Sequence, residues 1–210
     1  MIKLSLKGLA DFMTSGPRRQ RNILRNYKYP DEGFFPATYY KEARLHIDAY
    51  HKYNRQPNWL SKIEQGLRLE AAHSSGRTVD RLKNNARILR HYRNHFSEKK
   101  YELLDDLLLT LSFHDVIITV TPDLHVLESN TEKLVKLEFT SKKPKDTVRL
   151  IITQALFEAS EQAGMGLSSR QILYVDIPRG LEHLGARMGS RRRSEIEAAC
   201  QNISAIWPTI

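Results

Sequence analysis

The spacing of apolar residues along the chain changes near residue 100. Before that point they recur at helical spacing, and turn-forming segments such as SGP, NRQPN and HSSG separate the periodic stretches. Beyond it they alternate or run continuously and are rich in β-branched types, as in LLLTLSF, VIITVT, LHVLE, KLVKLEF and QILYVDI. The pattern therefore predicts helices in the first half and strands in the second.

The clearest helix of the first half is expected over residues 78–96. Thr78 is its expected N-cap. Its apolar residues fall on one face, as an amphipathic helix requires: Val79, Leu82, Ala86, Leu89 and Phe96. Arginines occupy much of the remaining surface, and Arg87, Arg90 and Arg93 make this a helix that could lie along a phosphate backbone.

Two helices are expected among the strands of the second half. One has Asp146 as its expected N-cap and ends at Gly164, and the other closes the chain over residues 190–207. The order strands, helix, strand, helix predicts a mixed β-sheet flanked by helices. The expected fold is α/β, with a basic helical region over residues 1–100 and an α/β core over residues 101–210.

The positive charge of the chain lies in its first half. The formal net charge is +9. Residues 1–100 hold 21 Lys or Arg against 9 Asp or Glu, whereas residues 101–210 hold 12 against 15. This excess favours a polyanion partner, for which we expect DNA. A positive net charge in this half would also be found in a ribosomal protein, in a protein that binds a membrane surface, or where basic side chains are simply scattered and solvated.

The hydropathy and the cysteine content of the chain indicate the cellular compartment of the protein. No run of 18 uncharged apolar residues occurs, and Asp11 interrupts the N-terminal segment, so we expect a soluble cytoplasmic protein with no membrane contact. Cys200 is the only cysteine, which excludes disulfides within the chain and cysteine-rich zinc sites. It is expected to be a buried thiol on the last helix.

Two acids stand out among the strands. Asp123 follows Pro122 at the end of an apolar strand, a place where Asp is also common as a turn residue. Glu138 lies within the strand KLVKLEF, on the same face as Lys136 and Thr140. A carboxylate in the middle of such a strand needs solvent, a cation or a proton. Together the two acids indicate a metal site or its vestige.

This order of elements, over about residues 101–180, resembles the PD-(D/E)XK phosphodiesterase superfamily, in its RecB-like branch. The resemblance implies a restriction-endonuclease-like core in which Asp123 and Glu138 bind Mg²⁺ beside the phosphate that is cleaved. The family lysine, two residues after the second acid, is replaced by Thr140. Lys136 and Lys142 are the candidates for its role.

Two shorter matches extend the resemblance. The family's helix after the lysine strand carries a Gln, which Gln154 in TQALF matches. The N-terminal LSLKGLADFMTSGPRRQ is similar to the opening S-x-L-x-x-F-x-x-C-P-R-R segment of the RecB-like branch, including Arg18 and Arg19, which we expect to contact nucleic acid. Gly16 replaces the cysteine of that segment, so no iron–sulfur cluster is expected.

Three functions remain open at this point. The first is a Mg²⁺-dependent DNA nuclease, which the retention of both acids favours. The second is a catalytically degenerate DNA-binding or scaffold subunit of a larger mobile-element or phage-defence assembly, with a protein partner or a second copy of itself, which Thr140 favours. The third is a helical RNA-binding or adaptor protein with an unrelated α+β domain.

Overall fold

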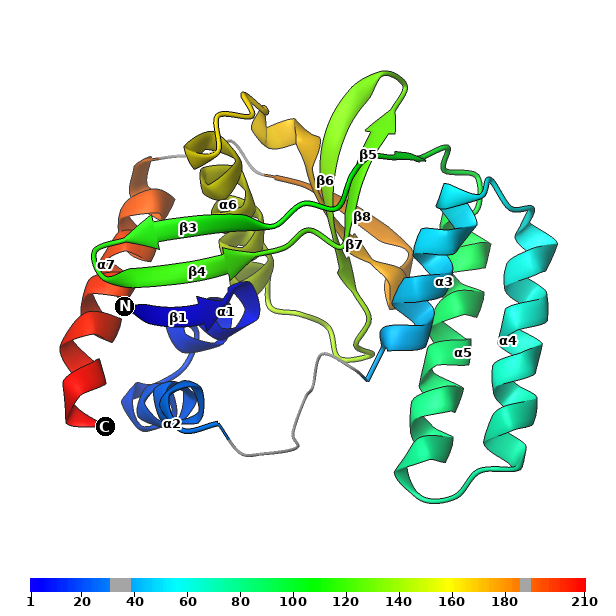
Figure 1. Ribbon diagram of the computed structural model, residues 1–210, viewed down its shortest axis with the longest axis horizontal. Coiled ribbons are helices and arrows are strands. Elements are labelled where there is room, and N and C mark those ends of the chain that lie inside the picture. The colour runs from blue at the N-terminus through cyan, green and yellow to red at the C-terminus, as the bar shows by residue number, and fades with distance from the viewer. Residues whose placement is uncertain (31–38, 186–189) are drawn as a thin grey trace.

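The computed structural model describes residues 1–30, 39–185 and 190–210 of the chain (Figure 1). The helices are α1 (Leu6–Met13), α2 (Pro17–Lys28), α3 (Lys41–Lys52), α4 (Pro57–Ala72), α5 (Arg77–Phe96), α6 (Asp146–Gln162) and α7 (Ser190–Ile206). The strands are β1 (Ile2–Ser5), β2 (Glu102–Leu103), β3 (Leu109–Phe113), β4 (Val116–Val120), β5 (Leu124–Glu128), β6 (Thr131–Glu138), β7 (Ile172–Asp176) and β8 (Leu181–Leu184). Within these residues, no helix is both long enough and apolar enough to cross a bilayer.

The strands form two sheets. In the first, β4 lies between β1, to which it is parallel, and β3, to which it is antiparallel. In the second, the order is β2-β5-β6-β7-β8, and β6 and β7 are parallel strands connected through α6. The chain passes from the first sheet to the second through residues 121–123, between β4 and β5. The predicted α/β class, with helices before mixed sheets, is confirmed.

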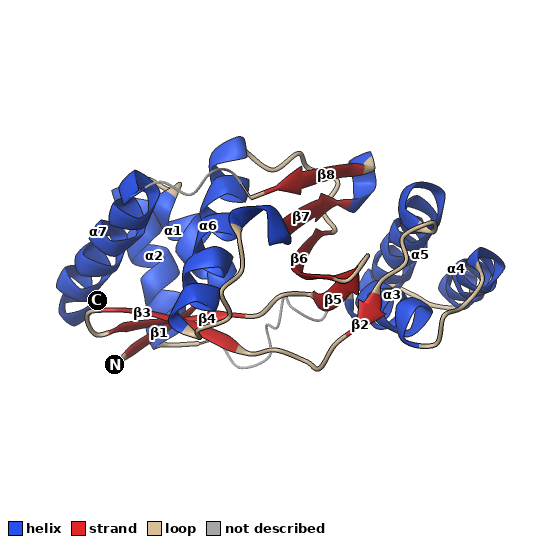
Figure 2. Ribbon diagram, turned by 90° about the horizontal axis from the view of Figure 1, so that it is seen from above, coloured by secondary structure: helices blue, strands red, loops and turns tan. Residues whose placement is uncertain are grey.

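Two hydrophobic cores hold these layers together. The first lies among the first sheet, α1, α2, α6 and α7, and includes Leu134, Ile172 and Tyr174 from one face of the second sheet. The second lies between α3, α4, α5 and the opposite face of that sheet, to which β6 contributes Val135 and Leu137. Because strand side chains alternate in direction, β6 and β7 supply both cores. Figure 2 shows α3–α5 and the first sheet at opposite ends of the molecule.

The structure differs from the expected elements in several local details. β1 is a strand inside the half that was predicted to be helical, and it depends on its pairing with β4. The N-cap of α5 is Gly76, not Thr78. α6 is capped by Lys145, and Asp146 is instead its first residue, where a carboxylate suits the helix dipole. Cys200 is buried as expected, and burial raises the pKa of its thiol to about 12.

The two cores do not divide at residue 100. β1, α1 and α2 pack with the later elements α6 and α7, whereas α3, α4 and α5 cover the far face of the second sheet. The basic first half is therefore distributed over two distant places. α2 lies beside α1 and α7 at one end of the molecule, and α5 lies at the other end, in both views (Figures 1 and 2).

Candidate nucleic-acid and metal site

Asp123 lies immediately before β5 with its side chain 2% exposed. Its Oδ2 accepts a hydrogen bond from the backbone N–H of Leu137 at 2.8 Å and lies 2.9 Å from Nζ of Lys136. Its Oδ1 lies 2.9 Å from Nη2 of Arg44, whose guanidinium also lies over the ring of Phe139. Two cations and one amide therefore surround this buried carboxylate.

The strand register explains how Asp123 meets Lys136. Leu124 pairs with Val135 in the antiparallel hairpin of β5 and β6. Just before this ladder, the backbone N–H of Asp123 donates to the carbonyl of Val135 at 2.8 Å, which holds Asp123 next to Lys136. A buried charge requires such partners, because desolvation without them is strongly unfavourable. Arg44 comes from α3, so the ion pair also attaches the helical layer to the hairpin.

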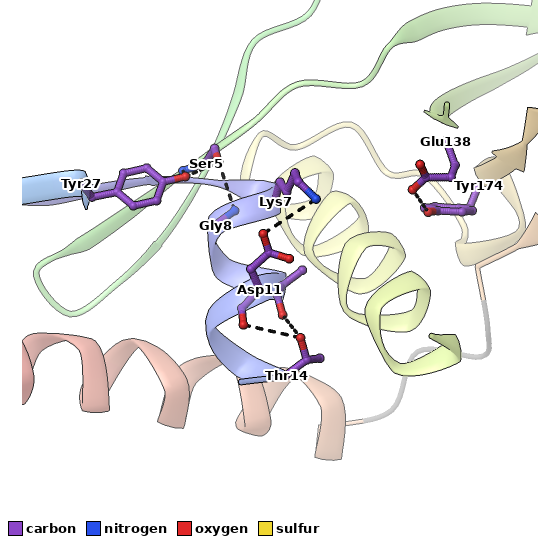
Figure 3. A network of polar contacts seen from close by, with 9 residues as sticks. Ser5, Lys7, Gly8, Asp11, Thr14, Tyr27, Glu138 and Tyr174 are labelled. Atoms are coloured by element: carbon purple, nitrogen blue, oxygen red, sulfur yellow. Dashed lines mark hydrogen bonds and ion pairs between the residues drawn. The ribbon is translucent and has the colours of Figure 1, made fainter. Parts of the chain in front are cut away.

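Glu138 ends β6 and is held by two donors. Its Oε1 accepts a hydrogen bond from the backbone N–H of Thr140 at 2.7 Å. Its Oε2 accepts one from the hydroxyl of Tyr174 on β7, also at 2.7 Å (Figure 3). Burial, and then the charge of Glu138, raises the pKa of Tyr174 above its ordinary value. The tyrosine is thus a neutral donor at any physiological pH.

Asp176 is a third acid of this region that sequence reasoning missed. The parallel register places it directly beside Glu138, and it is 2% exposed. Nη1 of Arg179 donates to both of its carboxylate oxygens at 2.9 Å, and Nη2 of the same guanidinium donates to the carbonyl of Ser141. The available signal was an acid at the end of the apolar strand ILYVD. Its partner Arg179 follows within three residues, in a short 3-10 turn.

The acids as placed do not match a Mg²⁺ site. Mg²⁺ takes oxygen ligands and retains several waters, whereas both oxygens of Asp123 contact cations. Within residues 1–30, 39–185 and 190–210, no three His, Cys, Asp or Glu side chains form a group that could hold a metal ion. Mg²⁺ at Asp123 and Glu138 stays a prediction, and it requires Arg44 and Lys136 to move away.

Lys136 and Lys142, the two candidates for the role of the family lysine that Thr140 replaces, lie in different surroundings. Lys136 pairs with Asp123 and also donates to the carbonyl of Thr121 at 3.1 Å. Lys142 is exposed beyond the end of β6, and its carbonyl accepts a hydrogen bond from Oγ1 of Thr140 at 3.3 Å. Thr140 contributes only its backbone N–H to Glu138. Lys136 is therefore the lysine that the structure brings to an acid.

Gln154 has a role inside the helical packing. Its side chain is buried within α6 and donates to Oε1 of Glu158, one turn later, at 2.8 Å. Oε2 of Glu158 lies 3.1 Å from Nη1 of Arg193 on α7. The expected Gln is thus part of the contact that joins α6 to α7, and no hydrogen bond joins it to Asp123 or Glu138 within the described residues.

The arginines of α5 contact other residues of the helical layer. Nη1 of Arg93 lies 3.3 Å from Oε2 of Glu64 on α4, and Nη2 of Arg87 donates to Oδ1 of Asn84 at 2.8 Å. Arg90 is exposed. Of the three arginines proposed for DNA on this helix, one neutralises a buried acid and one is held by an amide.

The arginines of α2 are different. Arg18 and Arg19, predicted to contact nucleic acid, are exposed, and so are Arg21 and Arg25, which sequence reasoning did not single out. Within the part of the chain that the structure describes, none of the four has an ion pair or a side-chain hydrogen bond. The signal for the two missed residues was a twelve-residue helix with five basic residues and no acid.

A cleft lies between α3 and residues 100–106 and has a volume of about 1070 Å³. Asp123 and Arg44 line one part of it, and Asp48 and Lys52 of α3 line another. Burial raises the pKa of Asp48 above its ordinary value. The cleft gives Asp123 a route to solvent, although its lining mixes acids with bases and has no single sign.

No protein-family model matches the chain, and no curated protein matches it either.

Proposed function

We propose that the chain is a DNA-binding subunit with a restriction-endonuclease-like core whose acids stabilise the fold and do not bind a catalytic metal. The ion pairs of Asp123 with Arg44 and Lys136 carry this proposal. They supply the positive charge that a divalent ion would supply at an active acid. The proposal corresponds to the degenerate member of the PD-(D/E)XK superfamily that the replacement of the family lysine by Thr140 indicates.

Charge arithmetic supports this assignment. Two unit charges 4 Å apart interact by about 4 kcal/mol at the effective dielectric of a protein surface. A Mg²⁺ ion at Asp123 would carry two charges and would meet both Arg44 and Lys136 at short range. Its binding would therefore require both side chains to leave a carboxylate that is buried and needs compensation. Arg44 and Lys136 already supply positive charge in place of the ion. Position 140 is a threonine, so the family lysine is absent.

The DNA partner is supported by the distribution of charge. Residues 1–100 carry 21 basic residues against 9 acidic ones. An excess of this size attracts a polyanion and releases its counterions on binding. The exposed arginines of α2 belong to the part of that excess that no ion pair of the described chain neutralises, together with exposed bases of α4 and α5 such as Lys62, Arg77 and Lys83.

A Mg²⁺-dependent nuclease is the second candidate. It is favoured by one observation, the placement of Glu138 and Asp176 in direct register on neighbouring strands, with Asp123 immediately before the adjacent strand β5. Carboxylates gathered at one sheet edge are the ligand type that a hydrolytic divalent metal uses. In this case Arg44 and Lys136 would have to be displaced when metal and DNA bind.

Incubation of the purified protein with linear and supercoiled DNA in Mg²⁺, Mn²⁺ or EDTA tests the two functions. We expect DNA binding without cleavage in every condition, and no rise in melting temperature on addition of Mn²⁺. Metal-dependent cleavage that Asp123→Ala abolishes would establish the nuclease instead.

The variant Thr140→Lys gives a sharper test of degeneracy. If only the lysine were missing, restoring it would produce cleavage. We expect Thr140→Lys to stay inactive, because Asp123 remains paired with Arg44 and Lys136. Cleavage by Thr140→Lys that is lost again in Thr140→Lys/Asp123→Ala would show a metal-competent site and contradict the proposal.

A further inference from the structure

α2 combines a buried anchor with an outward stripe of arginine. At 3.6 residues per turn, Arg18, Arg21 and Arg25 fall on one stripe of the helix, and all three are exposed. The helix turns another side inward, where Leu24 is 0% exposed and Tyr27 is partly buried. The arginines therefore take no part in the hydrophobic packing of the helix.

Folding does not account for these arginines. Like charges three or four positions apart on a helix repel each other, as Arg18 and Arg21 do, and Arg21 and Arg25. Arg18 and Arg19 also lie in the first turn, where the helix dipole disfavours positive charge. No acid lies in that turn, and Gly16 makes no side-chain cap. Arg25, in the last turn, suits the helix dipole, but the placement of Arg18 and Arg19 and the repulsion along the stripe oppose the stability of the isolated helix, which favours a role for the stripe outside the fold.

The helix is nevertheless held firmly in place. The hydroxyl of Tyr27 lies 2.5 Å from Oγ of Ser5, which also caps α1 (Figure 3). Gly8 allows this approach, because a Cβ at that position would overlap the Tyr27 ring. At the other end, Nζ of Lys28 donates to the carbonyl of Trp207 at 2.9 Å. A helix fixed in this way holds the backbone positions of its arginines in one arrangement, so that binding does not have to order the helix itself.

We propose that the arginine stripe of α2 is the surface that contacts the phosphate backbone of DNA. Arg18 and Arg25 are seven residues apart, or about 10 Å along the helix axis. One strand of B-DNA offers a phosphate about every 3.4 Å of axis, so the stripe spans about three of them. The guanidinium fork matches phosphate oxygens in pairs. This assignment rests on the proposed DNA-binding function and selects α2 over α5.

The variant Arg18→Gln/Arg21→Gln/Arg25→Gln tests the assignment, measured by fluorescence anisotropy on a short labelled duplex over a range of salt concentrations. Each neutralised phosphate contributes about 0.9 to the slope of log affinity against log salt, so three lost contacts lower the slope by about 2.7. We expect that change, together with a loss of affinity of at least about tenfold at moderate salt.

The matched control is Lys62→Gln/Arg77→Gln/Lys83→Gln, which removes the same charge from exposed positions on α4 and α5. It should change the salt slope by less than one third as much. Equal losses in the two variants would show that only total charge matters and would overturn the assignment. A greater loss in the control would transfer the contact to the helical layer. Unchanged far-ultraviolet circular dichroism must accompany either result.

Two further arms separate the failure of this assignment from failure of the proposed function. If the unmodified protein binds no DNA at any salt concentration, the DNA-binding function itself is wrong. If it binds DNA but the α2 variant binds equally well, only the assignment to α2 is wrong. Tighter binding to RNA or to anionic phospholipid vesicles than to duplex DNA, lost in the α2 variant, would replace DNA as the partner of this stripe.

Discussion

The two basic regions of the molecule differ in how many of their arginines are paired with acids. In the layer of α3, α4 and α5, Arg44 and Arg93 pair with the buried acids Asp123 and Glu64, and Arg81 pairs with Glu42. In α2 no described acid approaches the exposed arginines. The net charge of a region is therefore a weak predictor of how much positive charge its surface offers to a partner. A basic side chain that is paired with a buried acid is not available to bind a polyanion. What identifies a polyanion surface is basic charge that the fold leaves without a partner.

The largest expected effect is a loss of stability at acid pH in the layer of α3, α4 and α5. His51 of α3 is buried, its Nε2 lies 2.6 Å from the hydroxyl of Tyr92 on α5, and burial lowers the pKa of His51 to about 4. The unfolded chain, with its histidine pKa near 6.5, binds the proton more readily. The contribution of His51 is therefore complete above pH 6.5 and is lost as the pH falls to about 4, by roughly 3 kcal/mol in total.

Urea unfolding at several pH values between 7 and 4 measures this loss. The variant His51→Gln should lose much less stability across that window, whereas the triple variant of α2 should keep the full pH dependence. If His51→Gln and the unmodified protein lost stability in parallel, other groups would be responsible for the acid sensitivity, and His51 would not be the titrating residue.

A second, intermediate effect is expected at Glu64. The side chain of this acid is 10% exposed and is shared by Arg68 and Arg93. Arg93→Gln leaves Glu64 with only the more exposed Arg68, so we expect the free energy of unfolding to fall by about 1–2 kcal/mol. Equilibrium unfolding in urea at neutral pH gives this value. A change no greater than that of Lys83→Gln, an exposed substitution on the same helix, would show that Arg93 is free to serve another role.

The smallest effect, and the opposite in sign, is expected in α2. Replacing Arg18, Arg21 and Arg25 with Gln relieves two like-charge pairs, each worth about 0.2–0.5 kcal/mol, at nearly equal helix propensity. Stability should therefore stay constant or rise by up to about 1 kcal/mol. The same unfolding experiment, at low ionic strength where repulsion is strongest, measures it. A clear loss of stability would show that the arginines support the fold, and the contrast with Arg93 would disappear.

Much of the second sheet could be predicted from the sequence, for a local reason. β5 and β6 are recognisable because LHVLE and KLVKLE are β-rich segments separated by a turn, and Lys136 and Glu138 share a face because strand side chains alternate. β1 could not be predicted, because four residues become a strand only by pairing with β4, more than a hundred residues later. The division of the strands into two sheets likewise depends on long-range pairing.

The candidate site was predictable only in part for the same reason. Asp123 and Glu138 could be selected, since a polar residue at the edge of an apolar strand is visible in one sequence. Arg44 could not be assigned to Asp123, because the pair joins α3 to β5 across 79 positions. Asp176 meets Glu138 only through the register of β6 and β7. The partners that decide what a carboxylate can do are set by the fold.

Because Arg44 is paired with Asp123, the binding of a cation at Asp123 and the docking of α3 on the sheet affect each other. Any cation that takes this carboxylate must release Arg44, and α3 then loses its ion pair to the start of β5. By thermodynamic linkage, the firm docking of α3 weakens the affinity of Asp123 for a cation by the same factor by which the cation weakens the docking. The affinity of the protein for a divalent ion would thus report how tightly its helical layer is fastened to the sheet.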